Sequence, residues 1–175
     1  LSQHKQAVSG SVTAVSLEGS RPFLVEIQAL IDEATNSAKR LSVGVDSNRI
    51  SMLIAVLQKH GGIRVGDGDV YVNLVGGLRS SETAIDLPLA LALISSLHNR
   101  PISLGVACFG EIGLSGEVRP VKNGEERIKE VVKQGFQAVI VPIQNIPKNK
   151  TKPEKLFILK AIKHFSGLVF SNCIN

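Results

Sequence analysis

Apolar residues recur at helical spacing in the segment after Gly44. They are Ile50, Leu53, Ile54 and Leu57. Because these positions follow the i, i+3, i+4, i+7 pattern, the segment is predicted to form an amphipathic helix. Asp46 or Ser47 can cap its first turn, and Gly61-Gly62 offers a left-handed stop. This is the clearest helical signal in the chain.

Two further helices are predicted. The first runs from Thr83, whose hydroxyl can cap the first turn, to Arg100-Pro101, with Pro88 tolerable near its start. It is apolar nearly all round, so we expect it to lie at the centre of the domain. The other covers residues 124–134 and ends at Gly135.

Runs rich in Val, Leu, Ile and Thr predict the strands. Residues 10–17 and 23–30 flank the turn residues 18–22 and predict an N-terminal hairpin. The further strands expected are 69–75, 106–112, 117–121, 138–141 and 157–161, of which 106–112 and 117–121 form a second hairpin around 113–116. We expect polar loops over 34–41 and 144–154, and a short last helix over 164–170. This order predicts an α/β (α+β) domain with a mixed sheet and packed helices.

Composition supports one ordinary globular domain and excludes several other classes. The 175 residues are 43% hydrophobic and 20% charged, which does not fit a disordered or fibrous chain. The only cysteines, Cys108 and Cys173, lie far apart, so we expect no metal knuckle or redox pair and a reducing, cytoplasmic compartment. We expect Cys108 to be an inert core residue. Residues 1–10 lack a signal-peptide pattern, and the apolar stretch 87–97 is about half of what a bilayer needs, so no membrane contact is expected.

The positive charge is concentrated in the last third of the chain. Residues 1–60 hold 6 basic and 5 acidic side chains, residues 61–120 hold 4 and 6, and residues 121–175 hold 10 and 4. A lysine-rich, aromatic-poor segment suits a polyanion, although a solvated lysine surface that maintains solubility gives the same pattern.

Motifs for nucleotide or metal binding are absent from the sequence. There is no G-x-x-x-x-G-K-[ST] or G-x-G-x-x-G phosphate cradle, and the four histidines are scattered. Asp67 and Asp69 could mimic an acid/base or metal pair, but the flanking Gly66 and Gly68 favour a turn. We therefore expect no cofactor and no metal in this chain.

Two blocks are more specific than a general α/β pattern. They are residues 69–78 running into 82–87, DVYVNLVGGL and ETAIDL, and residues 109–120, FGEIGLSGEVRP. With blocks upstream and downstream, they resemble the C-terminal Lon-protease-like domain of the bacterial RadA/Sms DNA-repair ATPases, over about residues 9–142 and only weakly after 145. The resemblance implies a Lon-protease-like, or ribosomal protein S5 domain 2-like, fold. It also implies that residues 1–9 are a linker from an ATPase core and that residues 10–175 form the domain.

In Lon proteases this framework carries a Ser-Lys dyad, and the resemblance implies where the dyad would fall. The serine position is Ala84 and the lysine position is Glu125, and 125 − 84 = 41 keeps the spacing of about forty residues typical of the family. A methyl group cannot attack a carbonyl, so the resemblance implies a peptidase site without its catalytic groups. A displaced dyad would use Ser80, Ser81 or Thr83 as the nucleophile and Lys122 as the base. A helix cap at Thr83 and loop positions for the two serines are the simpler interpretation.

The resemblance also implies a function. The chain would be a hexamerisation scaffold and DNA-contacting platform for an ATP-dependent motor in recombinational repair, with single-stranded or branched DNA and a recombinase as partners. ATP, Mg and Zn would belong to other parts of the parent protein. Two alternatives stay open, a Lon-type Ser-Lys peptidase and an oligomerisation module that never touches DNA. The candidate DNA contacts are Arg64, Arg79, Arg119, Lys122, Arg127, Lys129, Lys148, Lys150, Lys152 and Lys155.

Overall fold

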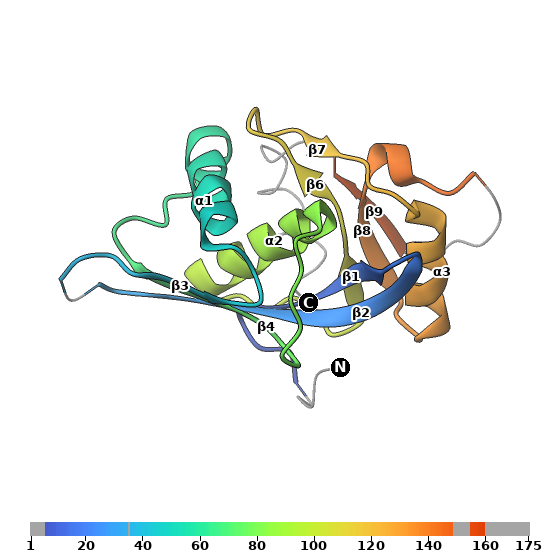
Figure 1. The fold of residues 1–175 in the computed structure, drawn as a ribbon, viewed down its shortest axis with the longest axis horizontal. Helices are drawn as coiled ribbons and strands as arrows, with labels where there is room; N and C mark the ends of the chain where they lie inside the picture. The colour runs from blue at the N-terminus through green and yellow to red at the C-terminus, as the bar shows by residue number, and fades with distance from the viewer. Residues whose placement is uncertain (1–5, 35, 149–154, 160–175) are drawn as a thin grey trace.

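A seven-stranded mixed sheet forms the centre of the molecule (Figure 1). The computed structural model describes residues 6–34, 36–148 and 155–159. The strand order is β3-β4-β2-β1-β5-β8-β9, and β6 and β7 form a separate two-stranded sheet. The strands are β1 (Ser11–Glu18), β2 (Arg21–Asp32), β3 (Arg40–Val43), β4 (Asp69–Leu74), β5 (Val106–Cys108), β6 (Glu111–Ile112), β7 (Val118–Arg119), β8 (Ala138–Pro142) and β9 (Lys155–Leu159). The predicted α/β class with mixed strand pairing is confirmed, whereas the Lon-like fold stays a prediction.

The N-terminal hairpin is confirmed, with a tighter turn than expected. β1 and β2 pair antiparallel from Ser11↔Gln28 to Glu18↔Arg21. The connection therefore contains only Gly19 and Ser20, and the flanking residues of the predicted loop 18–22 belong to the strands. Two-residue connections are the commonest in hairpins because their twist matches that of the paired strands.

Helix α1 (Ser47–Gly61) follows the sequence prediction closely. The Asp46 side chain caps it by accepting a hydrogen bond from the Asn48 N–H at 2.8 Å. Ile50, Leu53 and Leu57 are buried, as their spacing predicts. Gly62 ends the helix at φ 65°, in the left-handed region.

Helix α2 (Asp86–Leu97) is central, as expected, but its predicted start at Thr83 is wrong. A single 3-10 turn, η1 (Thr83–Ile85), precedes it, and no side chain caps that turn. Every residue from Asp86 to Ser95 is buried. The helix packs on β1 and β2 and supplies the centre of the main core.

Two predicted segments differ clearly from the structure. The predicted loop 34–41 ends in a strand, because β3 begins at Arg40 and pairs parallel with β4. The predicted strand 106–112 is interrupted at Gly110, whose N–H donates to the Ala84 carbonyl at 2.9 Å and whose carbonyl accepts from the Leu87 N–H at 3.0 Å. These bonds to the start of α2 take the chain out of the main sheet before β6 begins.

Most of the remaining predicted elements are present. Helix α3 (Gly124–Lys133) and β8 are confirmed, and Asp67 lies in the turn before β4, as expected. The second hairpin is present but shorter than predicted, as β6 and β7. β9 begins two residues before the predicted strand 157–161, and the predicted helix 164–170 lies outside the described residues.

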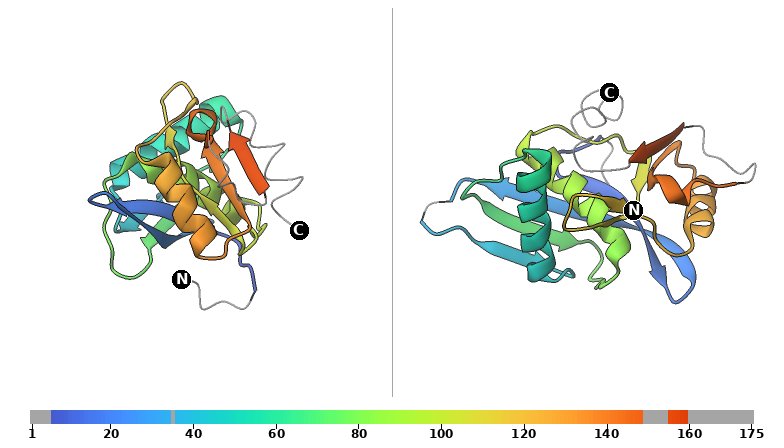
Figure 2. Two further views of the ribbon diagram at one scale, coloured as in Figure 1. Left: turned by 90° about the vertical axis from the view of Figure 1, so that its right-hand side faces the viewer. Right: turned by 90° about the horizontal axis from the view of Figure 1, so that it is seen from above.

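The sheet carries helices on both faces, but unequally. α1 and α2 cover one face along most of its length (Figures 1 and 2). α3 packs on the other face, where Val15, Phe109 and Ile128 are fully buried in a second core. Figure 2 shows α3 at the β8 end of the molecule and α1 at the opposite end. The second face is therefore covered around β1, β5, β8 and the first half of β2, and left open around the second half of β2, β4 and β3.

The structure also bears on Cys108, on membrane spans and on metal sites. Cys108 is completely buried in the main core, as predicted. None of the helices in the described ranges is long and apolar enough to cross a bilayer. In the same ranges, no three His, Cys, Asp or Glu side chains are grouped closely enough to hold a metal ion.

Gly44 and Gly62 allow a test of the packing at the end of β3. Both have positive φ, at 85° and 65°, but only Gly44 is enclosed, since a Cβ there would collide with the Leu78 carbonyl and lie 2.7 Å from the Leu74 Cβ. We expect Gly62→Ala to lower the free energy of unfolding by about 1 kcal/mol, through backbone strain alone. Gly44→Ala should cost a further 1–3 kcal/mol or so, because the neighbouring atoms must also move. Urea denaturation measures both, and equal losses would contradict the packing described here.

Candidate functional site

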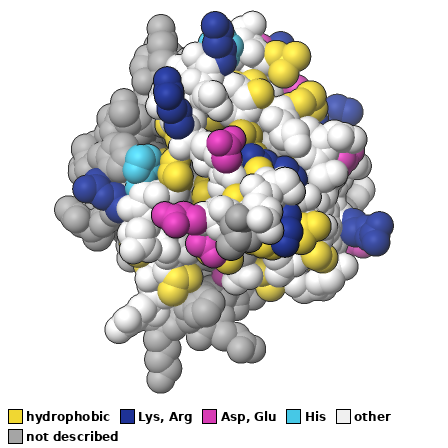
Figure 3. All heavy atoms as spheres, turned by 90° about the vertical axis from the view of Figure 1, so that its left-hand side faces the viewer, with side chains coloured by type: hydrophobic (Ala, Val, Ile, Leu, Met, Phe, Trp, Pro, Cys, Tyr) yellow, Lys and Arg dark blue, Asp and Glu magenta, His cyan; other side chains and the backbone are white. Residues whose placement is uncertain are grey.

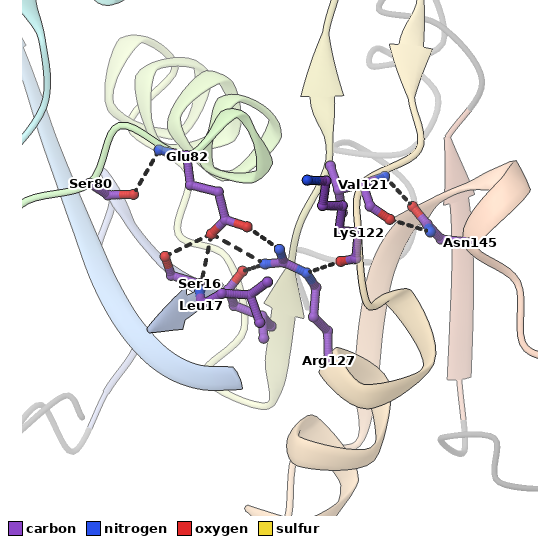
Figure 4. Close-up of polar contacts among 9 residues, drawn as sticks. Ser16, Leu17, Ser80, Glu82, Val121, Lys122, Arg127 and Asn145 are labelled. Atoms are coloured by element: carbon purple, nitrogen blue, oxygen red, sulfur yellow. Dashed lines mark hydrogen bonds and ion pairs between the residues drawn. The ribbon is translucent and has the colours of Figure 1, made fainter. Parts of the chain in front are cut away.

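A buried ion pair joins the segment before η1 to helix α3 (Figure 4). The Arg127 side chain is 0% exposed, and its Nη2 pairs with the Glu82 Oε1. Arg127 also donates from Nε to the Lys122 carbonyl at 2.8 Å and from Nη1 to the Val15 carbonyl at 2.6 Å. Figure 4 shows the carboxylate and the guanidinium pointing toward one another from these two segments.

Glu82 has further partners that complete the network. Its Oε2 accepts from the Ser16 hydroxyl at 2.9 Å and from the Leu17 N–H at 3.0 Å. Its own N–H donates to the Ser80 hydroxyl at 3.2 Å. Three separate segments, the end of β1, the loop before η1 and the start of α3, therefore meet at one carboxylate. The Arg127 guanidinium also lies 5.7 Å from the centre of the Phe109 ring, within the range of a cation–π contact.

This network lies beside the two positions that the sequence analysis assigned to a degenerate dyad. Ala84 is in η1 and completely buried, two residues after Glu82. Glu125 is in the first turn of α3, two residues before Arg127. Neither position offers a nucleophile or a neutral base.

The displaced dyad gains no geometric support. The Ser80 hydroxyl accepts from the Glu82 N–H, and Ser81 is exposed in the loop. The Lys122 side chain is exposed, and within the described ranges no hydrogen bond joins it to Ser80, Ser81 or Thr83.

A second buried ion pair, missed by the sequence analysis, lies at the start of α2. Arg49 of α1 binds both carboxylate oxygens of Asp86, and the Ile112 N–H donates to Asp86 Oδ2 at 3.1 Å. Burial raises the pKa of the Asp86 carboxyl above its ordinary value, although Arg49 and the Ile112 N–H act in the opposite direction. Asp86 in turn raises the pKa of Arg49. The pair forms part of the wall of a cleft of about 290 Å³ between α1 and the β6–β7 hairpin.

The candidate DNA contacts separate into four groups. The exposed side chains are Arg64, Arg79, Lys122, Lys129 and Lys148. Arg119 is exposed but neutralised, because it pairs with Glu117 at 2.5 Å and with Glu111 at 3.6 Å. Arg127 was wrongly predicted as a surface contact, since its buried guanidinium is used within the fold. Lys150 and Lys152 lie outside the described residues, and only the backbone of Lys155 is described, at the start of β9.

The exposed basic residues do not form one compact patch on the face seen in Figure 3. Dark-blue side chains are spread over that face and alternate with acidic ones. Arg79 lies in a groove of about 640 Å³, lined by residues 42–46 and 77–81. The groove is found where the parallel strands β3 and β4 both end. Crevices at the carboxyl ends of parallel strands are common ligand sites in α/β proteins.

The protein is a mixed α/β domain. Two ion pairs, one near the first turn of α2 and one in the first turns of α3, stabilise this fold. Residues 26–145 match the family described as subunit ChlI of Mg-chelatase, and the chain belongs to that family. It is also a homologue of proteins named DNA repair protein RadA. It is 48% identical to the one from Haemophilus influenzae, over 93% of this chain and 36% of the relative.

Two other relatives carry the same name. The Escherichia coli protein is 47% identical over 93% of this chain and 35% of its own length. The Pseudomonas aeruginosa protein is 52% identical over 85% of this chain and 33% of its own length. The chain thus spans about a third of the length of the curated relatives it matches.

The Glu82–Arg127 pair leads to a stability prediction. Glu82→Ala should lower the free energy of unfolding by about 3 kcal/mol or more, because it leaves a buried guanidinium without its counter-ion. Glu117→Ala is the matched control, since its partner Arg119 is exposed and surface pairs contribute about 0–1 kcal/mol. Urea denaturation of both variants compares the two losses. A loss for Glu82→Ala as small as that of the control would contradict the network.

Proposed function

We propose that this chain is a non-catalytic, self-associating module of a RadA-type DNA repair protein and that it contacts DNA through exposed basic side chains. The observation that supports the non-catalytic part of the proposal is the buried Glu82–Arg127 pair, because it uses the charged residues around Ala84 and Glu125 within the fold. The identity of 47–52% to proteins named DNA repair protein RadA supports the assignment to repair.

The proposal includes a Lon-like origin of the domain. The support is the spacing of Ala84 and Glu125 together with their position at η1 and the start of α3. In this proposal the chain binds no ATP, Mg or Zn itself, and any such cofactor acts in another part of the parent protein. The chain contributes assembly, as a ring of six copies, and a surface for single-stranded or branched DNA.

DNA contact would depend on phosphate neutralisation rather than base stacking. Arg79, Lys122 and Lys129 are exposed, and none of them forms an ion pair with an acidic side chain among the described residues. The chain has one Tyr and no Trp, so it offers few rings on which bases can stack. Affinity of this kind falls steeply with salt, because binding releases counter-ions from the phosphates.

The module is expected to have no peptidase activity. Turnover in a Lon-type site needs a hydroxyl and a base together, and Ala84 and Glu125 supply neither. Incubation with unfolded casein or a fluorogenic peptide should give no turnover above buffer. Turnover that disappears in Thr83→Ala or Lys122→Ala would establish the displaced dyad and overturn this part of the proposal.

The DNA contact can be tested by fluorescence anisotropy with a labelled single-stranded oligonucleotide over a range of salt concentrations. If Arg64 and Arg79 each neutralise one phosphate, replacing both by Ala should lower the slope of log K against log[salt] by about 1.4. Replacing Lys148, Lys150, Lys152 and Lys155 together tests the lysine-rich segment in the same way. Arg119→Ala is the control expected to change little, because Glu111 and Glu117 already neutralise this residue.

The same measurement decides between the proposal and its main rival. If the chain does not bind the oligonucleotide at low salt, or if both sets of substitutions leave binding unchanged, the DNA-contacting role is wrong. The chain would then be an oligomerisation module without DNA contact.

A further inference from the structure

An apolar row on the open face of the sheet contains the one tyrosine of the chain. The row consists of Leu30 on β2, Tyr71 on β4 and Leu41 on β3, which are successive partners in the strand register. Leu30 is 55% and Leu41 56% exposed. These side chains line a groove of about 540 Å³. Exposed apolar side chains grouped in this way mark a contact surface more often than scattered ones do.

A row of amide side chains lies beside the apolar row on the same face. Gln28 on β2 is the register partner of Asn73 on β4, two residues along each strand from Leu30 and Tyr71. Both amides line the same groove, and Asn73 is exposed. Gln28 also donates to the Glu26 carboxylate at 3.0 Å, so Asn73 is the better placed to bind a ligand. Amides donate and accept hydrogen bonds, as the edges of nucleic-acid bases do.

The apolar groove continues into the groove that contains Arg79. Residues 42 and 43 line both grooves, and the second has a volume of about 640 Å³. The Ser80 N–H donates to the Gly44 carbonyl at 2.9 Å, which holds the segment that carries Arg79 against the end of β3. Asp46 lines the second groove too, but its carboxylate caps α1. An exposed cation therefore lies just beyond the apolar and amide rows.

The charges give this face a direction. Asp32 and Asp69 are register partners on the other side of the apolar row, and the Tyr71 hydroxyl donates to Asp69 Oδ2 at 3.4 Å. Lys39 is exposed at the start of β3 and offsets part of this negative charge. Arg79 lies at the opposite end, beyond the amide row. An anionic group is therefore attracted to the Arg79 end of the face and repelled from the aspartate end.

We propose that single-stranded DNA crosses this face, with one base on the apolar row, the polar edge of that base at Asn73 and a neighbouring phosphate at Arg79. A nucleotide has the same three parts as the groove: a flat apolar face, a polar edge and an anionic group. Sheet faces that expose an aromatic side chain bind the bases of single-stranded nucleic acids in this way. The site rests on the DNA contact in the proposed function and gives it a location. Phosphates supply most of the affinity, and this site adds one base.

A peptide fits this surface less well than a nucleic acid does. A peptide bound as an added strand would use the backbone groups along the outer edge of β3. The Gly44 carbonyl at the end of that edge already accepts from the Ser80 N–H, and residues 77–81 lie against it. A base contacts side chains on the face of the sheet and needs none of these backbone groups.

Fluorescence anisotropy with two labelled strands of equal length, oligo(dT) and a fully abasic strand, separates the base from the phosphates. At low salt the chain should bind oligo(dT) about 5–150-fold more tightly, the range expected for one base on an aromatic side chain. Tyr71→Ala should remove this preference without changing the slope of log K against log[salt]. Arg79→Ala should keep the preference and lower the slope by about 0.7, because one phosphate contact is lost.

A second pair of variants keeps the test valid if Tyr71→Ala does not fold. Leu41→Glu places a carboxylate in the groove without removing a buried side chain, and it should weaken oligo(dT) binding about tenfold more than Leu114→Glu does. Leu114 is the matched control, because it is 70% exposed in the turn between β6 and β7 and its substitution changes the net charge equally. Equal losses, or a parent that binds both strands equally, would overturn the base site and leave the proposed DNA contact intact. A parent that binds neither strand would reject both.

Intrinsic fluorescence tests the site independently of affinity. Because the chain has one Tyr and no Trp, its aromatic emission comes from Tyr71. Saturating oligo(dT) should quench this emission after correction for the absorbance of the strand, whereas the saturating abasic strand should leave it unchanged, since only oligo(dT) brings a base onto the ring. An emission that oligo(dT) leaves unchanged, or that both strands quench equally, would overturn the proposal.

Discussion

The buried Glu82–Arg127 pair is the interaction on which the arrangement of the domain depends. A guanidinium without solvent exposure is costly, because an ion loses its hydration when it is buried. The cost is offset here by acceptors from several segments: the Glu82 carboxylate and the carbonyls of Lys122 and Val15. Arg127 belongs to the helix on one face of the sheet, and Glu82 precedes the helix on the other. One ion pair thus connects the two cores at the end of β1.

The second pair, Arg49–Asp86, acts in a similar way on the other side of α2. It joins α1 to the start of α2, and through the Ile112 N–H it also holds the β6–β7 hairpin. The N-terminal end of α2 is therefore fixed by one ion pair just before it and another within its first turn. This explains how a helix that is apolar nearly all round can keep a defined position, since dispersion contacts alone are less directional than paired charges.

The sequence predicted the elements that have a strong local signal. The spacing of Ile50, Leu53 and Leu57 was enough for α1, and the apolar character of residues 86–95 was enough to place α2 in the core. β3 was missed because two of its four residues, Leu41 and Val43, are exposed and its strand state depends on pairing with β4. Thr83 was assigned as a cap because its residue type suits that role, but the chain forms a 3-10 turn there.

The candidate site was less predictable, and Arg127 shows why. Arginine is usually a surface residue, so charge alone suggested a DNA contact. A different signal was present in the sequence: Gly124, Arg127, Ile128 and Val131 follow helical spacing, and all four are buried on one face of α3. The periodicity could have placed Arg127 in the interior. Its partner could not have been identified in this way, because Glu82 lies 45 residues earlier and meets Arg127 only in the folded chain.

The Glu82–Arg127 network also restricts how this sequence can drift over evolutionary time. A substitution at either position alone passes through a protein with one buried charge and no counter-ion, and selection against unfolded protein removes most such intermediates. A substitution at one of the two positions is therefore acceptable only together with a compensating substitution at the other. Glu82 is constrained further because its carboxylate also binds the Ser16 hydroxyl and the Leu17 N–H of β1. Neighbouring exposed positions such as Ser81 and Lys122 are not bound by this condition. Lineages are free to change their surface chemistry there while the two charged residues persist as a unit.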